Sequence, residues 1–513
     1  MALLGKVIKG ALHLKKLLNK GELDAVAAQE KVLRNHLVKA KNTSFGKFFN
    51  FEEILKRDDV KKAFAEKVPF FDYDKIYKDW WHKLLEGEPD VCWPGTTHYF
   101  ALSSGTTGKE SKRIPVTSDM IKAIKDTSKQ QILCLSNFDL PAEVFEKEIL
   151  MLGSSTDLTV KGEYLEGEIS GISASNIPFW FESYYKPGKD IAGIADWDQR
   201  VLEIAKKARK WDIGALSGIP AWIQLMLEKI ISYNNLTNIH EIWPNLTLYA
   251  TGGVAFEPYR KNFEKLLAKP LYYIDTYLAS EGFLAFQTRP DTESMALVLD
   301  NGIYFEFIPF NEDNFKDGEI IKNPTILGID EVEEGKEYAI LISTCAGAWR
   351  YMIGDTIRFT DLSRHEILIT GRTKFFLNVA GSQLSVEKMN AAIKMLEDDQ
   401  EISIKEFLVA AVAYEGAFAH KWYIGSGDDI DVEKATSKLD AYLKDINKNY
   451  KVAREKALKK VFIEVVPPDY FYEWHADHKK MGGQTKTPRV MKEEQFTEWE
   501  TFVKSHFQAE NPE

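Results

Sequence analysis

The most informative stretch of the sequence is FALSSGTTGKESK, residues 100–112, in which hydroxyl side chains and glycines dominate. Glycines let backbone N–H groups turn inward and Ser and Thr hydroxyls add donors, so this stretch can form a nest for phosphate oxygens. It is not a Walker loop, because two residues separate Gly105 from Gly108 where that loop has four. Composition alone leaves a plain Ser/Gly surface turn as the alternative interpretation.

This stretch resembles the phosphate loop of the acyl-adenylate-forming superfamily, which includes acyl-CoA synthetases, luciferases and peptide-synthetase adenylation domains. Together with the segment KRIPVT, residues 112–117, it is similar to one branch, the auxin-responsive Gretchen Hagen family of acyl acid–amido synthetases. Residues 40–46, 68–69 and 87–94 resemble further parts of that family, so the resemblance covers essentially the whole chain. It implies that ATP is a substrate, held by Ser103, Ser104, Gly105, Thr106 and Thr107.

A second motif, DTYLASEG at residues 275–282, follows a predicted strand and resembles the Tyr-x-x-Ser/Thr-Glu element of the superfamily. The resemblance implies that the ring of Tyr277 covers adenine and that Glu281 holds the Mg²⁺ that bridges the phosphates. Thr276 and Ser280 are further nucleotide contacts of the same element. Without the resemblance, Tyr277 reads as a half-buried strand aromatic and Glu281 as an acid at a helix N-terminus.

Shorter segments complete the implied nucleotide site. The pair Gly252 and Gly253 resembles the glycines whose bare backbone lies against adenine, although such a pair is usually only a turn. Asp355, in the segment RYMIGD, would hydrogen-bond both ribose hydroxyls, since a carboxylate can accept two bonds at once; alone, it reads as a turn residue. Arg372, in TGRTK, would meet ribose or phosphate at a hinge whose pivot is Lys374, and the alternative is a charged linker.

Lys486 is the candidate catalytic lysine, in the segment GGQTKTPRV that is similar to the Gln-x-Lys-x-Pro-Arg tail of the family. It could bridge the attacking carboxylate and the α-phosphate as negative charge gathers there, and the alternative is an ordinary exposed lysine. The chain departs from family patterns at Ala279, Met352 and Gln383, where relatives can have serine, arginine and lysine. Arg350 could substitute for the arginine that Met352 replaces.

The motifs together imply a two-step reaction in which Lys486 and Glu281 are the catalytic residues. A small carboxylic acid attacks the α-phosphorus of ATP to form an acyl-adenylate, and an amine, expected to be an amino acid, then forms an amide. The protein aligns the reactants and neutralises charge around phosphorus. Three alternatives stay open: a thioester-forming acyl-CoA ligase, a nucleotide-binding homologue without catalysis, and a peripheral membrane protein.

Strands must bring these motifs together. Apolar runs at 148–152, 246–250 and 271–274 end beside them, and helical patterns lie between the runs, which predicts a mainly parallel sheet. Short β-type runs over 296–370, with an Asn-Gly turn, predict an antiparallel region that closes the large domain. Helical and strand patterns after residue 371 predict a small α+β domain.

The predicted fold class is therefore α/β. The large N-terminal adenylate-forming domain, residues 1–371, has β-sheets flanked by helices and binds ATP and the acid. The small α+β lid domain, residues 372–513, is expected from the resemblance to be mobile and to rotate between the two half-reactions, carrying Lys486 in or out.

Composition limits the partners. The 513 residues carry a formal net charge of −11, so the protein repels nucleic-acid phosphates and we expect no nucleic-acid partner. Three widely separated cysteines without a CxxC spacing argue against disulfides and zinc and favour the cytoplasm. Lysines interrupt the apolar residues 1–20, so neither a signal peptide nor a membrane span is expected. We expect a monomer or a weak homodimer.

Overall fold

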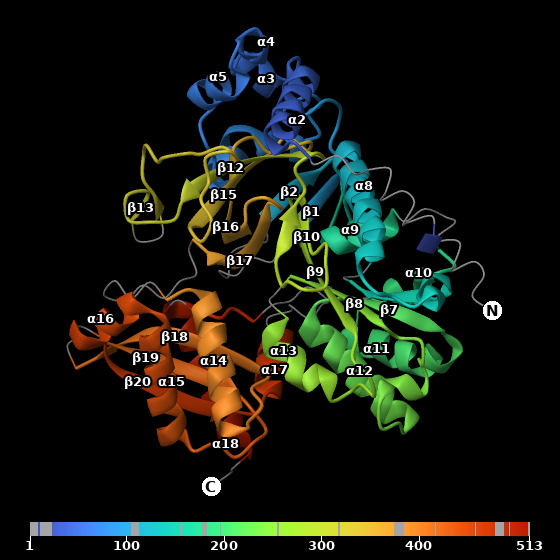
Figure 1. Ribbon diagram of the computed structural model, residues 1–513, viewed down its shortest axis with the longest axis vertical. Helices are drawn as coiled ribbons and strands as arrows, with labels where there is room; N and C mark the ends of the chain where they lie inside the picture. Colours follow the sequence, from blue (N-terminus) through green and yellow to red (C-terminus); the bar gives the residue numbers. More distant parts are fainter. Residues whose placement is uncertain are drawn as a thin grey trace.

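The chain folds around an eleven-stranded sheet that occupies the part before residue 373, as seen in a computed structural model (Figure 1). The structure describes residues 9–10, 23–103, 112–153, 156–176, 182–194, 196–253, 256–316, 319–373, 384–415, 417–456, 458–477, 487–491 and 493–510. In spatial order the strands of the large sheet are β12 (Ile303–Pro309), β15 (Glu337–Thr344), β16 (Tyr351–Asp361), β17 (Glu366–Arg372), β11 (Met295–Leu297), β10 (Gly282–Phe286), β9 (Tyr272–Ala279), β8 (Leu248–Gly252), β7 (Ile213–Gly218), β3 (Glu148–Leu152) and β6 (Tyr185–Lys186).

One half of this sheet is parallel and the other half is antiparallel. Strands β6, β3, β7, β8 and β9 pair in parallel, so their carboxyl ends lie along one edge. From β9 to β12 every pairing is antiparallel. This arrangement confirms the predicted α/β fold, in which an antiparallel region closes a parallel sheet. The edge formed by the strand ends is where ligands bind in open α/β sheets.

The helices over the parallel half begin and end at signals in the sequence. Helix α12 (Pro220–Asn234) has a proline in its first turn, where the missing N–H leaves no bond unmade, and it ends at Asn235 in the left-handed conformation. Helix α11 (Trp197–Lys207) packs beside it over a shared apolar core. The rings of Trp197 and Trp222 meet edge to face there, with centroids 4.5 Å apart. Helix α13 (Glu257–Glu264) follows β8 and contributes side chains to the same apolar core.

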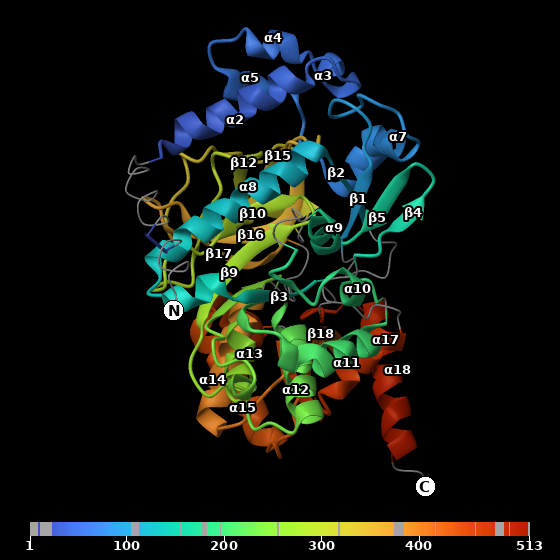
Figure 2. The ribbon, with the colours of Figure 1, turned by 90° about the vertical axis from the view of Figure 1, so that its right-hand side faces the viewer.

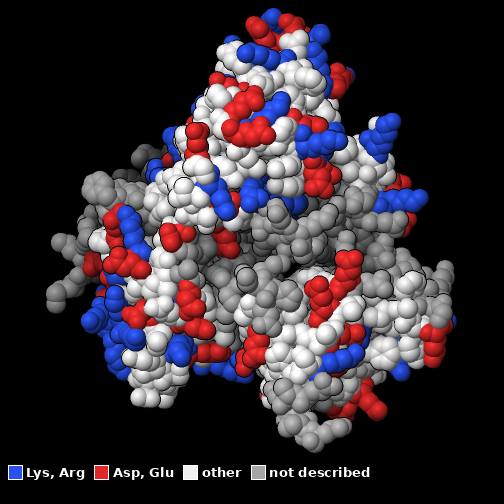
Figure 3. Space-filling model, turned by 180° about the vertical axis from the view of Figure 1, so that it is seen from behind, with Lys and Arg blue, Asp and Glu red and all other residues white. Residues whose placement is uncertain are grey.

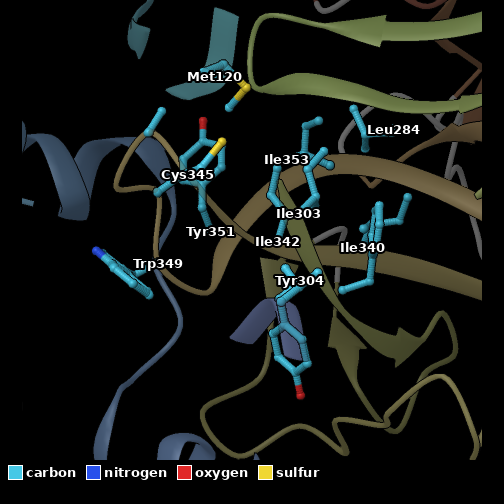
Figure 4. Close-up of a cluster of buried hydrophobic side chains, with 14 of the residues drawn as sticks. Met120, Leu284, Ile303, Tyr304, Ile340, Ile342, Cys345, Trp349, Tyr351 and Ile353 are labelled. Carbon is cyan, nitrogen blue, oxygen red and sulfur yellow. The ribbon is translucent and has the colours of Figure 1, made fainter. Parts of the chain in front are cut away.

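A group of helices at the N-terminal end packs on the antiparallel half of the sheet (Figure 2). Its members are α2 (Ala25–Ala40), α3 (Ser44–Phe48), α4 (Phe51–Leu55) and α5 (Val60–Lys67). Gln29 of α2 is buried, and its amide group donates to the carbonyls of Leu299 and Ile303. Its own carbonyl accepts the N–H of Phe305. Figure 4 shows part of the adjoining apolar core, where side chains of the large sheet such as Ile342 and Tyr351 lie near Trp349 of the loop between β15 and β16.

A four-stranded sheet beside the large one carries the two strands that flank the predicted phosphate turn. Its strands in spatial order are β2 (Lys112–Val116), β1 (Tyr99–Ser103), β5 (Tyr164–Gly167) and β4 (Thr159–Lys161). Helix α8 (Ser118–Cys134) follows β2 and begins at Thr117, whose hydroxyl accepts the N–H of Met120. Further elements are α6 (Tyr73–Ile76), α7 (His82–Leu85), α9 (Ile169–Ser175), α10 (Lys189–Ala192), β13 (Phe315–Lys316) and β14 (Glu319–Ile320).

The chain after residue 384 forms a three-stranded sheet covered by helices on both faces. Alternate residues of its first strand serve the two faces, as the strand period requires: Phe407 and Val409 join one core, Leu408 and Ala410 the other. This confirms the predicted α+β character. The elements are β18 (Glu406–Tyr414), β19 (Ala417–Gly425) and β20 (Leu458–Val466), with α14 (Val386–Gln400), α15 (Val432–Ile446), α16 (Lys448–Lys456), α17 (Asp469–Asp477) and α18 (Glu493–Glu510).

Acidic and basic side chains are interspersed over the face shown in Figure 3. Cys92 and Cys345 are buried free thiols, and Cys134 is half-buried. Within the part of the chain that the structure describes, no helix has both the length and the apolar character needed to cross a bilayer.

Arg350 ties the N-terminal helices to the large sheet. Its guanidinium makes a two-pronged pair with the Glu306 carboxylate, both bonds 2.8 Å, and donates to the carbonyls of Ala65 and Val68 at 2.9 and 2.7 Å. Arg350 is 3% exposed and Glu306 6%. Because these four bonds occupy the guanidinium inside the core, Arg350 does not replace the family arginine whose place Met352 takes.

We predict that Glu306→Gln destabilises the N-terminal domain by about 3–5 kcal/mol, because the buried Arg350 charge would lose its counter-ion. Urea unfolding followed by circular dichroism measures this loss. The matched control is Glu333→Gln, which removes an exposed partner of Lys336 and should leave the unfolding midpoint unchanged. A loss below about 1 kcal/mol for Glu306→Gln would contradict the prediction.

Candidate nucleotide-binding site

The predicted phosphate turn connects two paired strands. β1 and β2 are antiparallel and Ser103 stands opposite Lys112, so the strands bracket the turn from both sides. The candidates Ser104, Gly105, Thr106 and Thr107 lie outside the described residues. Tyr73 contacts strand β2, which follows the turn. Its hydroxyl accepts the N–H of Arg113 at 2.9 Å, and its ring lies 5.2 Å from the Lys112 ammonium. Sequence inspection gave no role to Tyr73, because nothing local links it to a loop so far along the chain.

A hydrogen-bonded cluster of Tyr277, Asp355 and Arg372 joins three of the predicted motifs. The Tyr277 hydroxyl donates to Oδ2 of Asp355 at 2.5 Å, and Nε of Arg372 donates to Oδ1 at 2.7 Å. Asp355 and Arg372 face each other on the neighbouring strands β16 and β17. Tyr277 lies on β9, four strand positions from β16 in the sheet order. A flat sheet would separate those strands by about 19 Å, so the sheet must curl to close this contact.

The chemistry of this cluster suits a ribose. A carboxylate has about four lone-pair sites, and the two protein donors use one site on each oxygen of Asp355. Each oxygen therefore keeps capacity for one more donor, which matches a pair of neighbouring hydroxyls. Burial and the nearby Asp355 charge raise the pKa of Tyr277 well above its ordinary value, so its hydroxyl keeps the proton that it donates. The Tyr277 ring is 6% exposed and belongs to the large apolar core.

Glu281 sits at the tip of a tight hairpin beside the cluster. Ala279 pairs with Gly282, so Ser280 and Glu281 form a two-residue loop between β9 and β10 rather than the start of a helix. Burial, and then the charge of Asp355, raise the pKa of Glu281 from 4.5 to about 7, against the opposing charge of Arg372. Ser280 is half-buried in the same loop. The hairpin thus holds a carboxyl that ionises near neutral pH within the field of the cluster.

Glu281 has the chemistry of a ligand for Mg²⁺ that accompanies a nucleotide. In the described part of the chain no three or more His, Cys, Asp or Glu side chains gather as metal ligands, so an all-protein cage is not built there. Mg²⁺ usually takes one or two carboxylates and completes its octahedron with waters and substrate phosphates. A single carboxylate such as Glu281 is therefore a sufficient protein ligand for Mg²⁺ on a nucleotide.

The glycine pair lies at the end of β8, directly beside β9. A Cβ added to Gly252 would lie 2.4 Å from the Thr276 hydroxyl and 2.7 Å from its carbonyl, so only glycine fits, and Gly253 has a φ of +85°. The Thr276 hydroxyl donates to the carbonyl of Thr251 at 2.8 Å and so holds the two strand ends together. The parallel register brings Gly252 opposite Thr276. Two predicted nucleotide segments thus form one continuous backbone surface.

The departures from the family pattern have different surroundings. Met352 is 8% exposed and packs with Ile308, Phe315 and Leu341, so the substitution places an apolar side chain in an apolar cluster. Ala279 ends β9. Lys374, Gln383 and Lys486 lie outside the described residues, which resume after the lysine motif at residue 487.

Models of one protein family match most of the chain: the GH3 family N-terminal domain over residues 14–203, its central domain over 296–368 and its C-terminal domain over 386–495. An indole-3-acetic acid-amido synthetase, GH3.2 of Arabidopsis thaliana, is 28% identical over 440 residues, which are 72% of this chain and 78% of that protein. The jasmonoyl-L-amino acid synthetase JAR4 of Nicotiana attenuata is 31% identical over 176 residues, 32% of this chain and 29% of that protein.

Solved structures share the fold. GH3.15 acyl acid amido synthetase superposes with a TM-score of 0.77 at 17% identity, covering 97% of this chain and 96% of that one. A 2-hydroxyisobutyryl-CoA ligase in its postadenylation state, in complex with 2-HIB-AMP, gives a TM-score of 0.57 at 11% identity, covering 93% and 92%. The fold of this chain is therefore that of adenylate-forming enzymes.

We predict that Glu281→Gln removes a pH-dependent loss of stability. Between about pH 4.5 and 7 the unfolded chain releases the Glu281 proton while the folded protein keeps it, so wild-type stability falls across that window, by about 3 kcal/mol in total. The variant should lack this fall and be the more stable protein at pH 8. Urea unfolding of both proteins at pH 5 and pH 8 measures the difference.

Glu397, whose pKa burial also raises to about 7, is present in both proteins, so its contribution cancels in the comparison. Equal losses of stability in wild type and Glu281→Gln between the two pH values would contradict the assignment.

Proposed function

Since the chain belongs to the Gretchen Hagen (GH3) family, as its motifs predict, we propose that it is an ATP-dependent acid–amido ligase. It activates a small carboxylic acid as the acyl-adenylate and transfers the acyl group to an amine, which we take to be an amino acid. The observation that carries the proposal is the cluster of Tyr277, Asp355 and Arg372 beside Glu281, which unites three nucleotide motifs at one sheet edge.

The substrate class follows from the relatives. Curated relatives are named for indole-3-acetic acid and for jasmonoyl-amino acids, and GH3.15 is known in complex with 2,4-DB. These names support a small carboxylic acid as the first substrate and an amino acid as the acceptor. The acyl-CoA ligase fold is shared too, so CoA is the competing acceptor.

The first half-reaction forms the bond between acid and phosphorus. A carboxylate oxygen attacks the α-phosphorus while the bond to the pyrophosphate oxygen breaks, and charge spreads over the phosphoryl oxygens. Asp355 grips the ribose, its two oxygens aimed by Tyr277 and Arg372. The turn from Ser103 to Thr107 surrounds the β- and γ-phosphates. Lys486 neutralises the charge that gathers on the α-phosphate.

Glu281 would hold Mg²⁺, and the bound ion would supply neutralisation of phosphate charge. Glu281 can act as its ligand only when ionised, and its pKa of about 7 makes that state available in neutral solution. Arg372, whose pKa the Asp355 charge raises, remains a cation throughout.

In the second half-reaction the amine nitrogen attacks the carbonyl carbon of the acyl-adenylate. The bond from that carbon to the phosphate oxygen breaks, AMP leaves, and the nitrogen gives up a proton as the amide forms. The buried carboxyl group of Glu281 and the continuous backbone surface of Gly252 and Thr276 keep the adenylate aligned for this attack. The C-terminal domain rotates between the two steps.

The free thiols of Cys92 and Cys345 support a reducing compartment, and we propose that the protein is cytoplasmic and a monomer or weak homodimer. Burial raises the pKa of Cys345 to about 12, so this thiol stays protonated and inert.

We predict carboxylate-dependent exchange of labelled pyrophosphate into ATP when the purified protein meets a panel of small organic acids with Mg²⁺. Mass detection of products formed with a mixture of amino acids, and separately with CoA, then identifies the acceptor. Amide products support the proposal, and thioester products alone would establish the CoA ligase alternative. No exchange with any acid of a broad panel would support the non-catalytic homologue.

The Lys486→Ala variant should lower the exchange rate by about 10²–10³ while ATP binds as before, because lysine acts where charge develops in the transition state. Lys504→Ala, an exposed lysine of α18, is the matched control and should exchange at the wild-type rate.

We further predict that Asp355→Ala weakens ATP binding by about 10- to 100-fold, since two hydrogen bonds from a charged acceptor to ribose are lost. Isothermal titration of ATP with Mg²⁺ measures the change. Asp361→Ala, on the same strand but paired with Ser363 and Arg364 instead, should bind ATP like wild type. Equal affinities in wild type and Asp355→Ala would remove the ribose assignment.

A further inference from the structure

A set of polar contacts joins helix α13 and its neighbour α12 to the edge of the C-terminal domain. Figure 1 shows α13 at the border between the two parts. Lys261 donates to the carbonyl of Ile402 at 3.0 Å, Ser403 donates to Oδ1 of Asn262 at 2.5 Å, and Lys405 lies 3.6 Å from Glu228. Contacts of this polar kind are typical of interfaces between domains that move relative to each other.

The buried centre of this border is a trio of Tyr259, Glu406 and Arg489. The Tyr259 hydroxyl of α13 donates to Oε1 of Glu406 at 3.0 Å and accepts from the Arg489 guanidinium at 3.1 Å. Arg489 also donates to Oε2 of Glu406 at 2.5 Å and to the carbonyl of Phe407. Tyr259 is 5% exposed, and the side chains of Glu406 and Arg489 are 2% and 11% exposed. Such desolvated, mutually satisfied charges make a rigid contact.

Arg489 belongs to the segment that directly follows the lysine motif. This segment, residues 487–491, runs along β18: the Val409 N–H donates to the Arg489 carbonyl at 2.9 Å, and the Met491 N–H donates to the Val409 carbonyl at 3.0 Å. His475 of α17 contacts the Thr487 hydroxyl at 3.3 Å. One end of the lysine loop is therefore fixed to the body of the C-terminal domain.

The trio also lies close in sequence to the predicted nucleotide turn. Tyr259 is six residues after Gly253, in the helix that follows the Gly252–Gly253 turn. Lys486 is three residues before Arg489, so their Cα atoms are at most about 11 Å apart. The same three side chains thus join the anchor of the lysine loop to the helix that carries the adenine turn.

We propose that Tyr259, Glu406 and Arg489 form a positioning clamp that fixes the C-terminal domain in the orientation used for adenylation. The clamp rests on the proposed function, because it acts through Lys486. Tyr259 is its only member from the N-terminal domain, and the pair of Arg489 and Glu406 lies wholly within the C-terminal domain.

Tyr259→Phe is the selective test, because it removes both hydrogen bonds that the Tyr259 hydroxyl makes across the border and leaves the pair of Arg489 and Glu406 in place. We expect acid-dependent pyrophosphate exchange to slow about tenfold, the KM for ATP to stay within about twofold, and amide formation from a synthetic acyl-adenylate to keep its wild-type rate. A purely structural role would change the exchange rate, the KM for ATP and the rate of amide formation together. Tyr233→Phe, which removes a half-exposed hydroxyl at the end of α12, is the matched control.

Hydrogen exchange detected by mass spectrometry tests the clamp without turnover. We expect peptides covering residues 402–409 and 487–491 to exchange at least about threefold faster in Tyr259→Phe than in wild type, and no faster in Tyr233→Phe. Unchanged exchange of these peptides would overturn the clamp. Faster exchange with an unaltered adenylation rate, or slowing of the amide step instead, would overturn its role in adenylation. Absence of activity in wild type would count against the proposed function alone, since the peptide measurement needs no substrate.

Discussion

The double hydrogen bond to Asp355 is the interaction on which the candidate site depends. One carboxylate accepts from a phenol on β9 and a guanidinium on β17, and these strands are far apart in the order of the sheet. The contact requires the sheet to curl, and Tyr277 shares one large apolar core with residues of the N-terminal helices. Burial of Tyr277, the curl of the sheet and the geometry of the Asp355 cluster therefore depend on one another.

Burial at this place has an electrostatic consequence. Glu281 is enclosed beside an ionised carboxylate, so its proton is held to about neutral pH and its charge costs stability when it forms. Perturbed pKa values of this kind cluster at functional sites, which supports Glu281 as part of the candidate site. Arg350 differs from Glu281 because its buried charge is paired with the Glu306 carboxylate. This ion pair stabilises the core.

Among the described residues, polar pairs and the edge-to-face contact of Tyr472 with Trp222 join the two parts of the chain. A border of this composition can open without exposing a large apolar surface, which suits a domain that changes orientation between two reaction steps. The buried trio of Tyr259, Glu406 and Arg489 favours one relative orientation of the two parts. It also shows why the arginine of a lysine-containing motif need not face a phosphate: here it anchors the strand that follows the lysine.

Local patterns in the sequence were sufficient for much of this protein. Periodicity and turn residues predicted the parallel strands, the antiparallel closure and the small second domain, because these depend on neighbours within a few positions. The resemblance of the motifs identified the family. Pattern also located Asp355, Tyr277 and Arg372 as candidates.

The tertiary structure alone decided how those candidates are used. Sequence could not show that the Tyr277 hydroxyl meets Asp355, that Thr276 spends its hydroxyl on Thr251, or that Glu281 lies in a hairpin tip rather than at a helix start. It also left Arg350 available for the nucleotide, whereas four buried bonds occupy it. Each of these outcomes depends on contacts between segments far apart along the chain, which propensity and spacing do not encode, because they are set by how the sheet curls and what its core encloses.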